Sequence, residues 1–271
     1  MKEKKPAPVC MILVLLAAVS AVVPALSGQM GEPYDSLLDC LVRSVVLAVL
    51  LGLFGADLLA FAKEKGTVGP LWLLPCAAVA AANFPLTALL SGAAAVTSPQ
   101  GIPLLALRCL LIGCTEEVAF RGVIHRAAVR KFCGRPHGYL CALLCSSALF
   151  GAFHLLNLFN APPADVLLQA GYTFLLGGMF AVCYDRTRRL SVCCLLHAVF
   201  DFGGHLLSSL GEGEPHDTGF AVVTAVCAVL CGLHILASLR SAGVFGDKNA
   251  CGREEISPAS QDHQDHKEET V

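Results

Sequence analysis

Long apolar segments dominate this sequence and restrict what it can fold into. Each is about twenty residues long, which is enough for a helix to cross the hydrocarbon core of a bilayer. We count about eight such segments, at residues 9–27, 40–62, 71–91, 101–120, 138–158, 164–184, 190–209 and 219–239. Overall, 55% of the residues are hydrophobic and only 15% are charged, against about 25% charged in soluble domains. The pattern predicts an all-α fold, a polytopic membrane bundle of about eight transmembrane helices.

Basic residues are distributed unevenly between the predicted loops. One set of alternate loops carries Lys and Arg, at Lys2, Lys4, Lys5, Lys63, Lys65, Arg126, Arg130, Lys131, Arg135, Arg186, Arg188, Arg189 and Arg240. The other set lacks them and carries acids, at Glu32, Asp35, Asp165, Glu212, Glu214 and Asp217. Because cytoplasmic loops are enriched in Lys and Arg, we expect a multi-pass protein of the cell membrane with both termini in the cytoplasm.

Two segments at the ends of the sequence need separate interpretation. Residues 9–27 are interpreted as the first span, although their basic start and the sequence Ala25-Leu26-Ser27 also resemble a cleavable signal peptide. Residues 1–245 are expected to form one transmembrane bundle. Residues 246–271 are polar and are expected to be a disordered cytoplasmic tail. The net charge of −2 does not indicate a nucleic-acid partner.

The first of three polar clusters within the apolar segments is formed by Glu116, Glu117 and Arg121. A charged side chain at the centre of a bilayer costs about 2.5–3.5 kcal/mol on insertion scales, so it needs a partner or a wet cavity. Glu117 and Arg121 are four residues apart and can pair on one helix face. Glu116 points about 100° away and can face a cavity. The spacing can therefore separate a general base from an ion-paired neighbour, although an ordinary ion pair at a helix end is the alternative.

The other two clusters contain histidines. His154 lies in the fifth segment with Asn157 nearby, and His197 and Asp201 lie four residues apart in the seventh. The carboxylate of Asp201 can fix the tautomer of His197, or both can bind a water or a metal ion. His205 extends the same face. Histidines that only join helices by hydrogen bonds are the alternative for each cluster. Because each buried polar group needs partners, we expect the clusters to meet.

A carboxylate beside two imidazoles points to hydrolysis of an amide or ester. The carboxylate can activate water as a general base, and the imidazoles can stabilise an oxyanion. A divalent metal that lowers the pKa of bound water is the other route. The sequence contains no GxSxG or HExxH motif. Most of the 14 cysteines lie in apolar segments and are interpreted as packing residues.

These clusters resemble three motifs of the CPBP family, which comprises CAAX prenyl proteases and bacteriocin-processing, Abi-like membrane proteins. Glu116-Glu117-x-x-x-Arg121 matches EExxxR, Phe150-x-x-x-His154 matches FxxxH, and His197-x-x-x-Asp201 matches HxxxN/D. The order and the internal spacing both agree. The resemblance covers about residues 100–205, and the rest of the chain adds only topology.

The resemblance implies an intramembrane endopeptidase whose catalytic cavity opens toward the cytoplasm and the lipid. Glu116 would be the base that activates water, and His154 and His197 would polarise the scissile carbonyl or bind its oxyanion. Asp201 would orient the water or His197, and Glu117 and Arg121 would shape the site. The family leaves open whether a divalent metal takes part. Asp201 stands where eukaryotic relatives usually carry Asn, which leaves open whether substrates are prenylated.

The expected partners are the lipid bilayer and a hydrophobic, membrane-associated or lipidated peptide substrate. Aromatic residues close to the motifs could line an apolar substrate pocket, namely Phe120, Phe150, Phe153, Phe200 and Phe202. A non-enzymatic immunity or scaffold protein and a proton-coupled transporter are the alternative functions, since transporters also bury acids and histidines. One geometric difficulty remains in this interpretation. His154 lies about 24 Å along its span at 1.5 Å per residue, deeper than Glu116 and His197.

Overall fold

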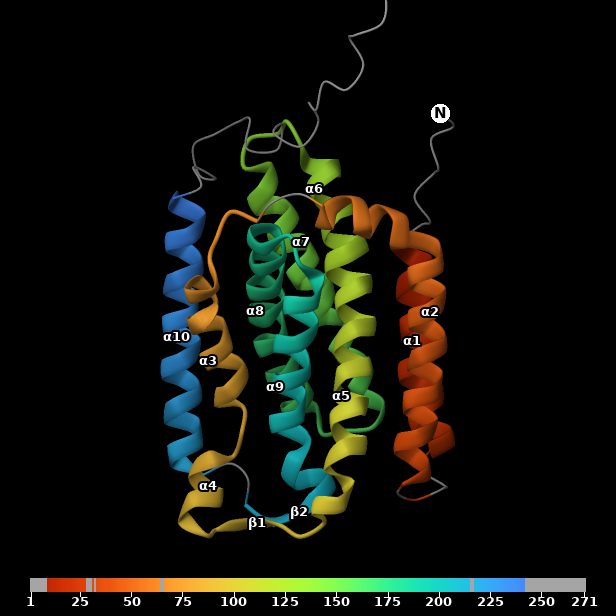
Figure 1. The fold of residues 1–271 in the computed structure, drawn as a ribbon, viewed down its shortest axis with the longest axis vertical. Coiled ribbons are helices and arrows are strands. Elements are labelled where there is room, and N and C mark those ends of the chain that lie inside the picture. Colours follow the sequence, from red (N-terminus) through yellow and green to blue (C-terminus); the bar gives the residue numbers. More distant parts are fainter. Residues whose placement is uncertain (1–8, 28–30, 32, 64–65, 215–216, 242–271) are drawn as a thin grey trace, which may run out of the picture.

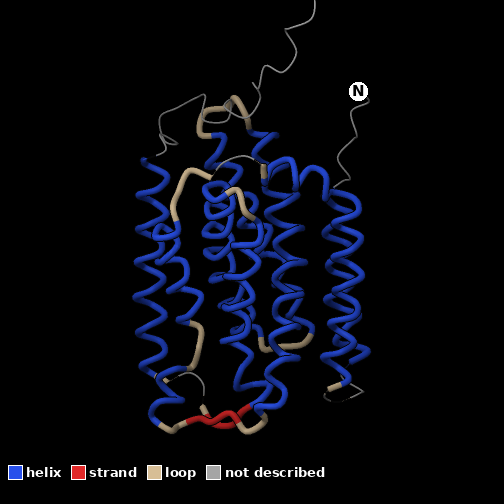
Figure 2. Tube along the Cα trace, in the orientation of Figure 1, coloured by secondary structure: helices blue, strands red, loops and turns tan. Residues whose placement is uncertain are grey.

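The fold is known from a computed structural model, which describes residues 9–27, 31, 33–63, 66–214 and 217–241. The described chain is almost entirely helical (Figures 1 and 2), so the predicted all-α bundle is confirmed. The helices are α1 (Val9–Ser27), α2 (Tyr34–Ala62), η1 (Pro70–Leu73), α3 (Leu74–Ala82), α4 (Leu86–Ser91), η2 (Pro99–Gly101), α5 (Ile102–Glu117), η3 (Val118–His125), α6 (Arg126–Phe132), α7 (Gly138–Phe153), η4 (His154–Phe159), α8 (Pro163–Thr187), α9 (Leu190–Leu210) and α10 (Thr218–Ser241). Two short strands, β1 (Ala94–Val96) and β2 (Gly211–Gly213), pair antiparallel at one end of the bundle. The expected tail at 246–271 lies outside the described residues.

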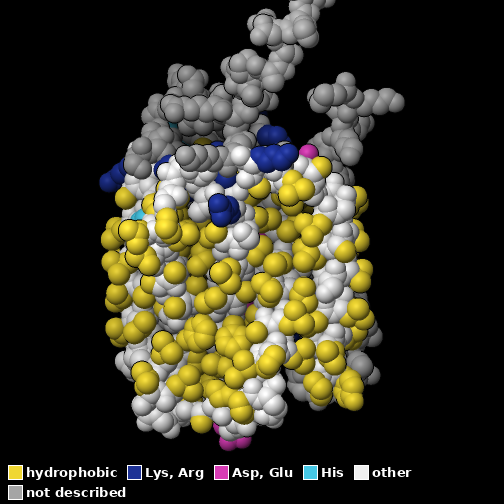
Figure 3. Space-filling model, viewed as in Figure 1, with side chains coloured by type: hydrophobic (Ala, Val, Ile, Leu, Met, Phe, Trp, Pro, Cys, Tyr) yellow, Lys and Arg dark blue, Asp and Glu magenta, His cyan; other side chains and the backbone are white. Residues whose placement is uncertain are grey.

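Five helical segments are long and apolar enough to cross a membrane. They are Tyr34–Leu59, Gly138–Phe159, Pro163–Thr187, Leu190–Leu210 and Thr218–Arg240. Their outer faces carry exposed Leu and Val side chains, and hydrophobic side chains cover most of the visible surface (Figure 3). In water such a surface would be costly, whereas lipid solvates it. The chain is therefore a multi-pass membrane protein, but the predicted total of eight spans is not established.

Two predicted spans differ from continuous helices. The segment 71–91 divides into η1, α3 and α4, and it bends around Asn83 and Pro85. The Asn83 side chain donates to the backbone oxygen of Phe200 at 2.7 Å, so the break is held against α9. The segment 101–120 continues past its predicted end, because α5 runs on through the π-helix η3 into α6 and ends at Phe132.

Glycine allows α5 and α9 to approach closely. A Cβ placed on Gly113 would lie 2.9 Å from the backbone oxygen of Cys194 and 3.1 Å from the backbone nitrogen of Ala198. Real side chains do not tolerate the first distance, so this crossing depends on glycine. The close contact brings the end of α5, which carries the first motif, beside His197 on α9.

The start of α7 removes the difficulty over the depth of His154. The turn between α6 and α7 stands beyond the ends of α2 and α9 (Figure 1). Helix α7 therefore enters the bundle from further out, and its end reaches the level of Glu116 and His197, with which His154 lines one cavity. Lys and Arg gather at this end of the visible face, and the opposite end shows Asp and Glu without Lys or Arg (Figure 3). This distribution matches the predicted orientation, which stays a prediction.

Candidate active site

The first motif lies where α5 changes from an α-helix to a π-helix. Glu116 and Glu117 are the last residues of α5, and η3 follows directly. Short π-helical segments occur frequently at functional sites. The predicted pair forms: Arg121 Nη1 donates to Glu117 Oε1 at 2.8 Å, and both side chains are buried. The guanidinium of Arg121 also packs 4.1 Å from the centre of the Phe150 ring in a cation–π contact.

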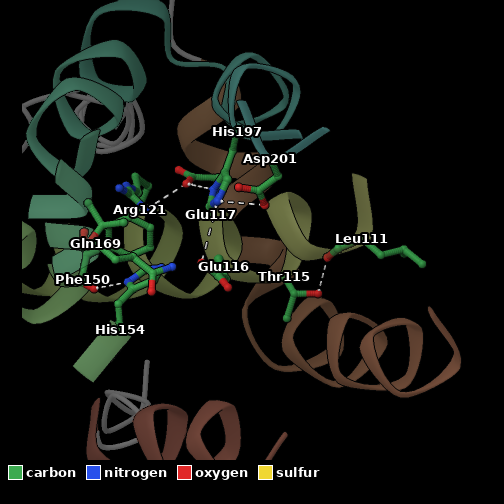
Figure 4. Close-up of polar contacts among 11 residues, drawn as sticks. Leu111, Thr115, Glu116, Glu117, Arg121, Phe150, His154, Gln169, His197 and Asp201 are labelled. Carbon is green, nitrogen blue, oxygen red and sulfur yellow. Dashed lines mark hydrogen bonds and ion pairs between the residues drawn. The ribbon is translucent and has the colours of Figure 1, made fainter. Parts of the chain in front are cut away.

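His197 connects the first and third motifs. Its Nδ1 donates to Glu117 Oε1 at 2.8 Å, since a carboxylate can only accept (Figure 4). Its Nε2 lies 3.5 Å from Asp201 Oδ2 and 3.8 Å from Glu116 Oε2. Glu117 therefore makes the close contact that fixes the ring, a role that the sequence pattern assigned to Asp201. The ring also stacks on Phe180, with centroids 5.4 Å apart.

His154 is held in the same manner by a different group. It is the first residue of η4, and its Nδ1 donates to the backbone oxygen of Phe150 at 2.8 Å. The Phe150 ring meets the rings of His154 and His197 edge-on, with centroid distances of 4.9 and 5.9 Å. Both imidazoles are thus fixed through Nδ1, which leaves Nε2 of each for other contacts.

A cavity of about 300 Å³ joins the three motifs. Its lining includes Glu116, His154, His197, Asp201 and His205. Glu117 and Arg121 do not line it and are buried behind it. Glu116 Oε2 has no hydrogen-bond partner in the described part of the chain. The division inferred from spacing is therefore present: Glu117 is ion-paired, and Glu116 faces the cavity.

The cavity lies between α1 and α2 on one side and the helices of the motifs on the other. Val19 and Val23 of α1 and Asp35 and Asp39 of α2 contribute to its lining. In the space-filling view, a cleft separates the lower part of α2 from the rest of the bundle (Figure 3). The lining thus extends toward the acidic end of the bundle, whereas the expected opening was at the end rich in Lys and Arg.

The aromatic residues near the motifs divide into core and cavity residues. Phe120 and Phe150 are each 1% exposed, pack against one another with ring centroids 4.9 Å apart, and do not line the cavity. Phe153 does line it. Phe120 and Phe150 therefore lie behind the site, and among the described Phe, Tyr and Trp residues Phe153 is the one that lines the cavity.

Nowhere in the described ranges do three His, Cys, Asp or Glu side chains form a group that could hold a metal ion. The hydrolysis proposed below is written with protein groups and water.

Two further buried polar clusters were not singled out from the sequence. Asp39 accepts hydrogen bonds from Arg43 and Arg108 in the cavity wall. Elsewhere, Asp185 accepts from Tyr139 at 2.6 Å and lies 2.8 Å from His125 Nε2. Both clusters could have been found in the sequence. Arg43, Arg108 and Asp185 are charged residues at or within apolar segments, where a charge needs a partner.

Fold and site together define a class: helical membrane proteins in which a carboxylate and two imidazoles from different helices face one internal cavity. Residues 98–203 match the family model described as type II CAAX prenyl endopeptidase, Rce1-like. The match contains all three motifs and confirms the resemblance to the CPBP family. It supports a CAAX-type intramembrane protease, and therefore a peptidase that acts on a membrane-associated peptide. No curated protein and no solved structure matches the chain.

Proposed function

We propose that this protein is an intramembrane endopeptidase in which Glu116 activates the water that attacks the peptide bond. The observation behind the proposal is that Glu116 lines the cavity whereas Glu117 does not. The buried Oε2 of Glu116 has no hydrogen-bond partner among the described residues and lies 3.8 Å from His197 Nε2. Its neighbour Glu117 is engaged by both Arg121 and His197. Of the two adjacent carboxylates, only Glu116 is placed to accept a proton from a water in the cavity.

The proposed reaction is written with the cavity residues and water alone. Glu116 takes a proton from the water, and the water oxygen bonds to the scissile carbonyl carbon. The oxyanion that forms is stabilised by His154 and His197 in their protonated form, in which Nδ1 keeps its hydrogen bond and Nε2 carries the proton that is donated to the oxyanion. The C–N bond then breaks as the leaving nitrogen receives the proton from Glu116. The products are a carboxylate and an amine.

Asp201 would act as a positioning residue in this scheme. Its Oδ2 lies 3.5 Å from His197 Nε2, and it lines the cavity. A water between Glu116 and Asp201 could donate to both carboxylates, which would fix its direction of attack. Asn at this position would accept only one such bond through its oxygen, so Asp201→Asn should retain part of the activity.

The substrate proposed is a hydrophobic peptide that reaches the cavity from the membrane. Val19, Val23, Ile112, Leu156 and Phe153 contribute apolar surface to the cavity wall, so the cavity can hold an apolar side chain or lipid beside the hydrolytic groups. The orientation proposed has both termini in the cytoplasm, in line with the segregation of Lys and Arg to one end.

Cleavage by purified protein in lipid nanodiscs tests the proposal. The probes are two fluorescent peptides, one ending in S-farnesylcysteine and three aliphatic residues and one with an unmodified hydrophobic sequence. Wild-type protein should cleave at least one of them, and Glu116→Gln and His154→Ala should reduce the rate at least 100-fold. Glu212→Gln makes the same chemical change at an exposed site on β2 and should leave the rate unchanged. Full activity in Glu116→Gln would refute the proposal.

The natural substrate can be sought by comparing cells that carry active and inactive protein. Membrane peptides from cells carrying wild-type protein would be compared with those from cells carrying Glu116→Gln. A peptide that stays uncleaved only in the second set identifies the substrate class, and its terminal residues show whether a lipid is required. A transporter would instead show proton-coupled uptake that His154→Ala abolishes, without any change in peptide termini.

A further inference from the structure

A pair of side-chain amides lies in the wall of the cavity near His154. Asn157 Nδ2 donates to Gln169 Oε1 at 2.7 Å, and both residues line the cavity that contains Glu116 and His197. Figure 4 shows Gln169 on the side of the site where His154 lies. Neither amide belongs to one of the three motifs, and the proposed hydrolysis does not use them.

The 3₁₀ helix η4 aligns Asn157 with His154. It begins at His154, and Asn157 is its fourth residue. Because a 3₁₀ helix has three residues per turn and rises about 2.0 Å per residue, side chains three positions apart eclipse one another. Asn157 therefore lies on the same face of η4 as His154, about 6 Å further along the helix. In an α-helix the same spacing would turn Asn157 about 60° away from that face.

The hydrogen bond between the two amides leaves an acceptor and a donor for a further partner. Asn157 Oδ1 and the amide nitrogen of Gln169 take no part in it. The phenol of Tyr172 shares a hydrogen bond with Gln169, which engages one N–H of the Gln169 NH₂ group and leaves the second. The pair therefore presents one C=O acceptor and one N–H donor beside His154.

A peptide that enters a cavity within a membrane needs such partners for its own backbone. Each residue other than proline carries one N–H donor and one C=O acceptor, and lipid offers neither of them a hydrogen bond. One acceptor next to one donor matches the N–H and C=O groups of an extended peptide. Because Asn157 and Gln169 are neutral, they can supply these hydrogen bonds without adding charge to the cavity.

The distance from His154 indicates which part of the peptide the amides would meet. In the proposed hydrolysis the scissile carbonyl oxygen lies at Nε2 of His154. An extended peptide spans about 3.3–3.6 Å per residue, so the separation of about 6 Å along η4 corresponds to about two residues. The amide pair would therefore meet a backbone group about two residues from the scissile bond.

We propose that Asn157 and Gln169 bind the backbone of the peptide substrate, with Asn157 accepting from a backbone N–H and Gln169 donating to a backbone C=O. These bonds hold the chain extended beside His154. The inference rests on the proposed function, since it assigns a substrate-binding role within the same cavity. Contacts to the backbone do not depend on the side chains of the peptide, so they suit hydrophobic substrates of varied sequence. A purely structural tie between η4 and α8 would give the same hydrogen bond without contacting a substrate.

Backbone esters test the inference by removing one N–H at a time. Each of the two fluorescent peptides named above would be made as a series in which a single backbone N–H is replaced by an ester oxygen. Binding to Glu116→Gln protein in nanodiscs would be measured by fluorescence anisotropy. In at least one series, one ester should raise the Kd at least fivefold. A series without such an ester in both peptides, including the absence of measurable binding, would overturn the inference.

Substitution of the amides then locates the contact, because coupling between an ester and a side chain shows that the two interact. Asn157→Ala, combined with Glu116→Gln, should reduce the effect of the same ester to less than twofold. Asn160→Ala is the matched control and should retain the effect, since Asn160 is exposed at the end of η4 and does not line the cavity. An undiminished effect in Asn157→Ala would overturn the inference.

Gln169→Leu provides a second variant, which keeps the inference testable if Asn157→Ala fails to fold. Combined with Glu116→Gln, it should raise the Kd of the all-amide peptide at least fivefold. Gln100→Leu makes the same change at an exposed position in η2 and should leave the Kd unchanged. Equal Kd values in Gln169→Leu and Gln100→Leu would overturn the inference.

The outcome for the inference can be separated from that for the proposed function. If an ester effect depends on Asn157 and wild-type protein cleaves neither peptide, the backbone-binding subsite stands and the endopeptidase proposal fails. If wild-type protein cleaves a peptide and no ester effect depends on Asn157, the endopeptidase stands and the subsite fails. Where cleavage occurs, mass spectrometry of the fragments locates the scissile bond, and the sensitive ester should lie about two residues from it.

Discussion

Glu117 Oε1 lies 2.8 Å from Nδ1 of His197 and 2.8 Å from Nη1 of Arg121, so one buried carboxylate oxygen joins the first and third motifs. Glu117 is fully buried, whereas Glu116 beside it faces the cavity. The two adjacent acids therefore have different structural roles. This difference separates catalytic from stabilising effects in experiment.

Glu116→Gln and Glu117→Ala should differ in stability although both lose activity. Removal of one partner from a buried ion pair costs about 3–5 kcal/mol because the other charge stays buried, so Glu117→Ala should unfold at a clearly lower temperature. Glu116 Oε2 has no described hydrogen-bond partner, and Glu116→Gln should unfold within about 2 °C of wild type. Thermal unfolding in nanodiscs measures both. Equal losses of stability would contradict the assigned roles.

Arg121→Lys should impair the protein despite the retained charge. The guanidinium is 2% exposed and packs over the rings of Phe150 and Phe180, with centroids 4.1 and 5.2 Å away. A Lys ammonium cannot reproduce this planar packing. We expect at least a tenfold loss of cleavage rate and a lower unfolding temperature. Arg135→Lys is the control, because Arg135 lies outside the motifs in the turn after α6. A similar loss of cleavage rate and unfolding temperature in Arg135→Lys would contradict the role assigned to the packing of Arg121.

Gly113→Ala should separate α5 from α9 and weaken the contact between Glu117 and His197. The added Cβ would meet the backbone oxygen of Cys194 at 2.9 Å, and a backbone atom cannot move aside as a side chain can. Overpacking of this kind costs about 1–3 kcal/mol. Gly52→Ala adds the same methyl group on α2, where nothing lies within 4 Å, and should be neutral. Unfolding temperature and cleavage rate should both fall in Gly113→Ala alone.

The sequence predicted contacts within a helix more successfully than contacts between helices. The pair of Glu117 and Arg121 follows from a four-residue spacing on one helix, and the structure contains it. The bond between Glu117 and His197 joins residues on α5 and α9, and nothing in either motif's spacing specifies which acid meets the imidazole. Spacing therefore suggested Asp201 as the close partner, whereas the crossing at Gly113 brings Glu117 nearer.

Two features of the fold depended on information outside any single segment. Apolar length alone predicted a continuous span at 71–91, but the segment divides where Asn83 hydrogen-bonds to the backbone of α9. The depth of His154 was estimated as if all spans began at one level. The turn between α6 and α7 instead stands beyond the other helix ends (Figure 1). The cluster of Asp39, Arg43 and Arg108 could have been predicted from the cost of charge in apolar segments.

Asp217 should make the stability of the fold depend on pH at its acidic end. Its Oδ1 accepts from Thr87 Oγ1 at 2.6 Å and from the backbone nitrogen of Phe220 at 2.7 Å, so it caps α10 and connects it to α4. These two hydrogen bonds, that of Thr87 first, lower the pKa of Asp217. A carboxyl group whose pKa is lower in the folded state stabilises that state above its unfolded pKa, about 3.9, and loses this effect as pH falls through the folded value.

Asp217→Ala should therefore lower the unfolding temperature at pH 7, and the difference from wild type should shrink as pH falls below about 4. Thr87→Val removes the first of the two hydrogen bonds and should produce a smaller loss with the same pH trend. Glu212→Ala, on exposed β2, should show neither effect. Thermal unfolding in nanodiscs between pH 3 and pH 7 provides the measurement. A difference that stays constant over this range would show that Asp217 acts only through packing and not through its charge.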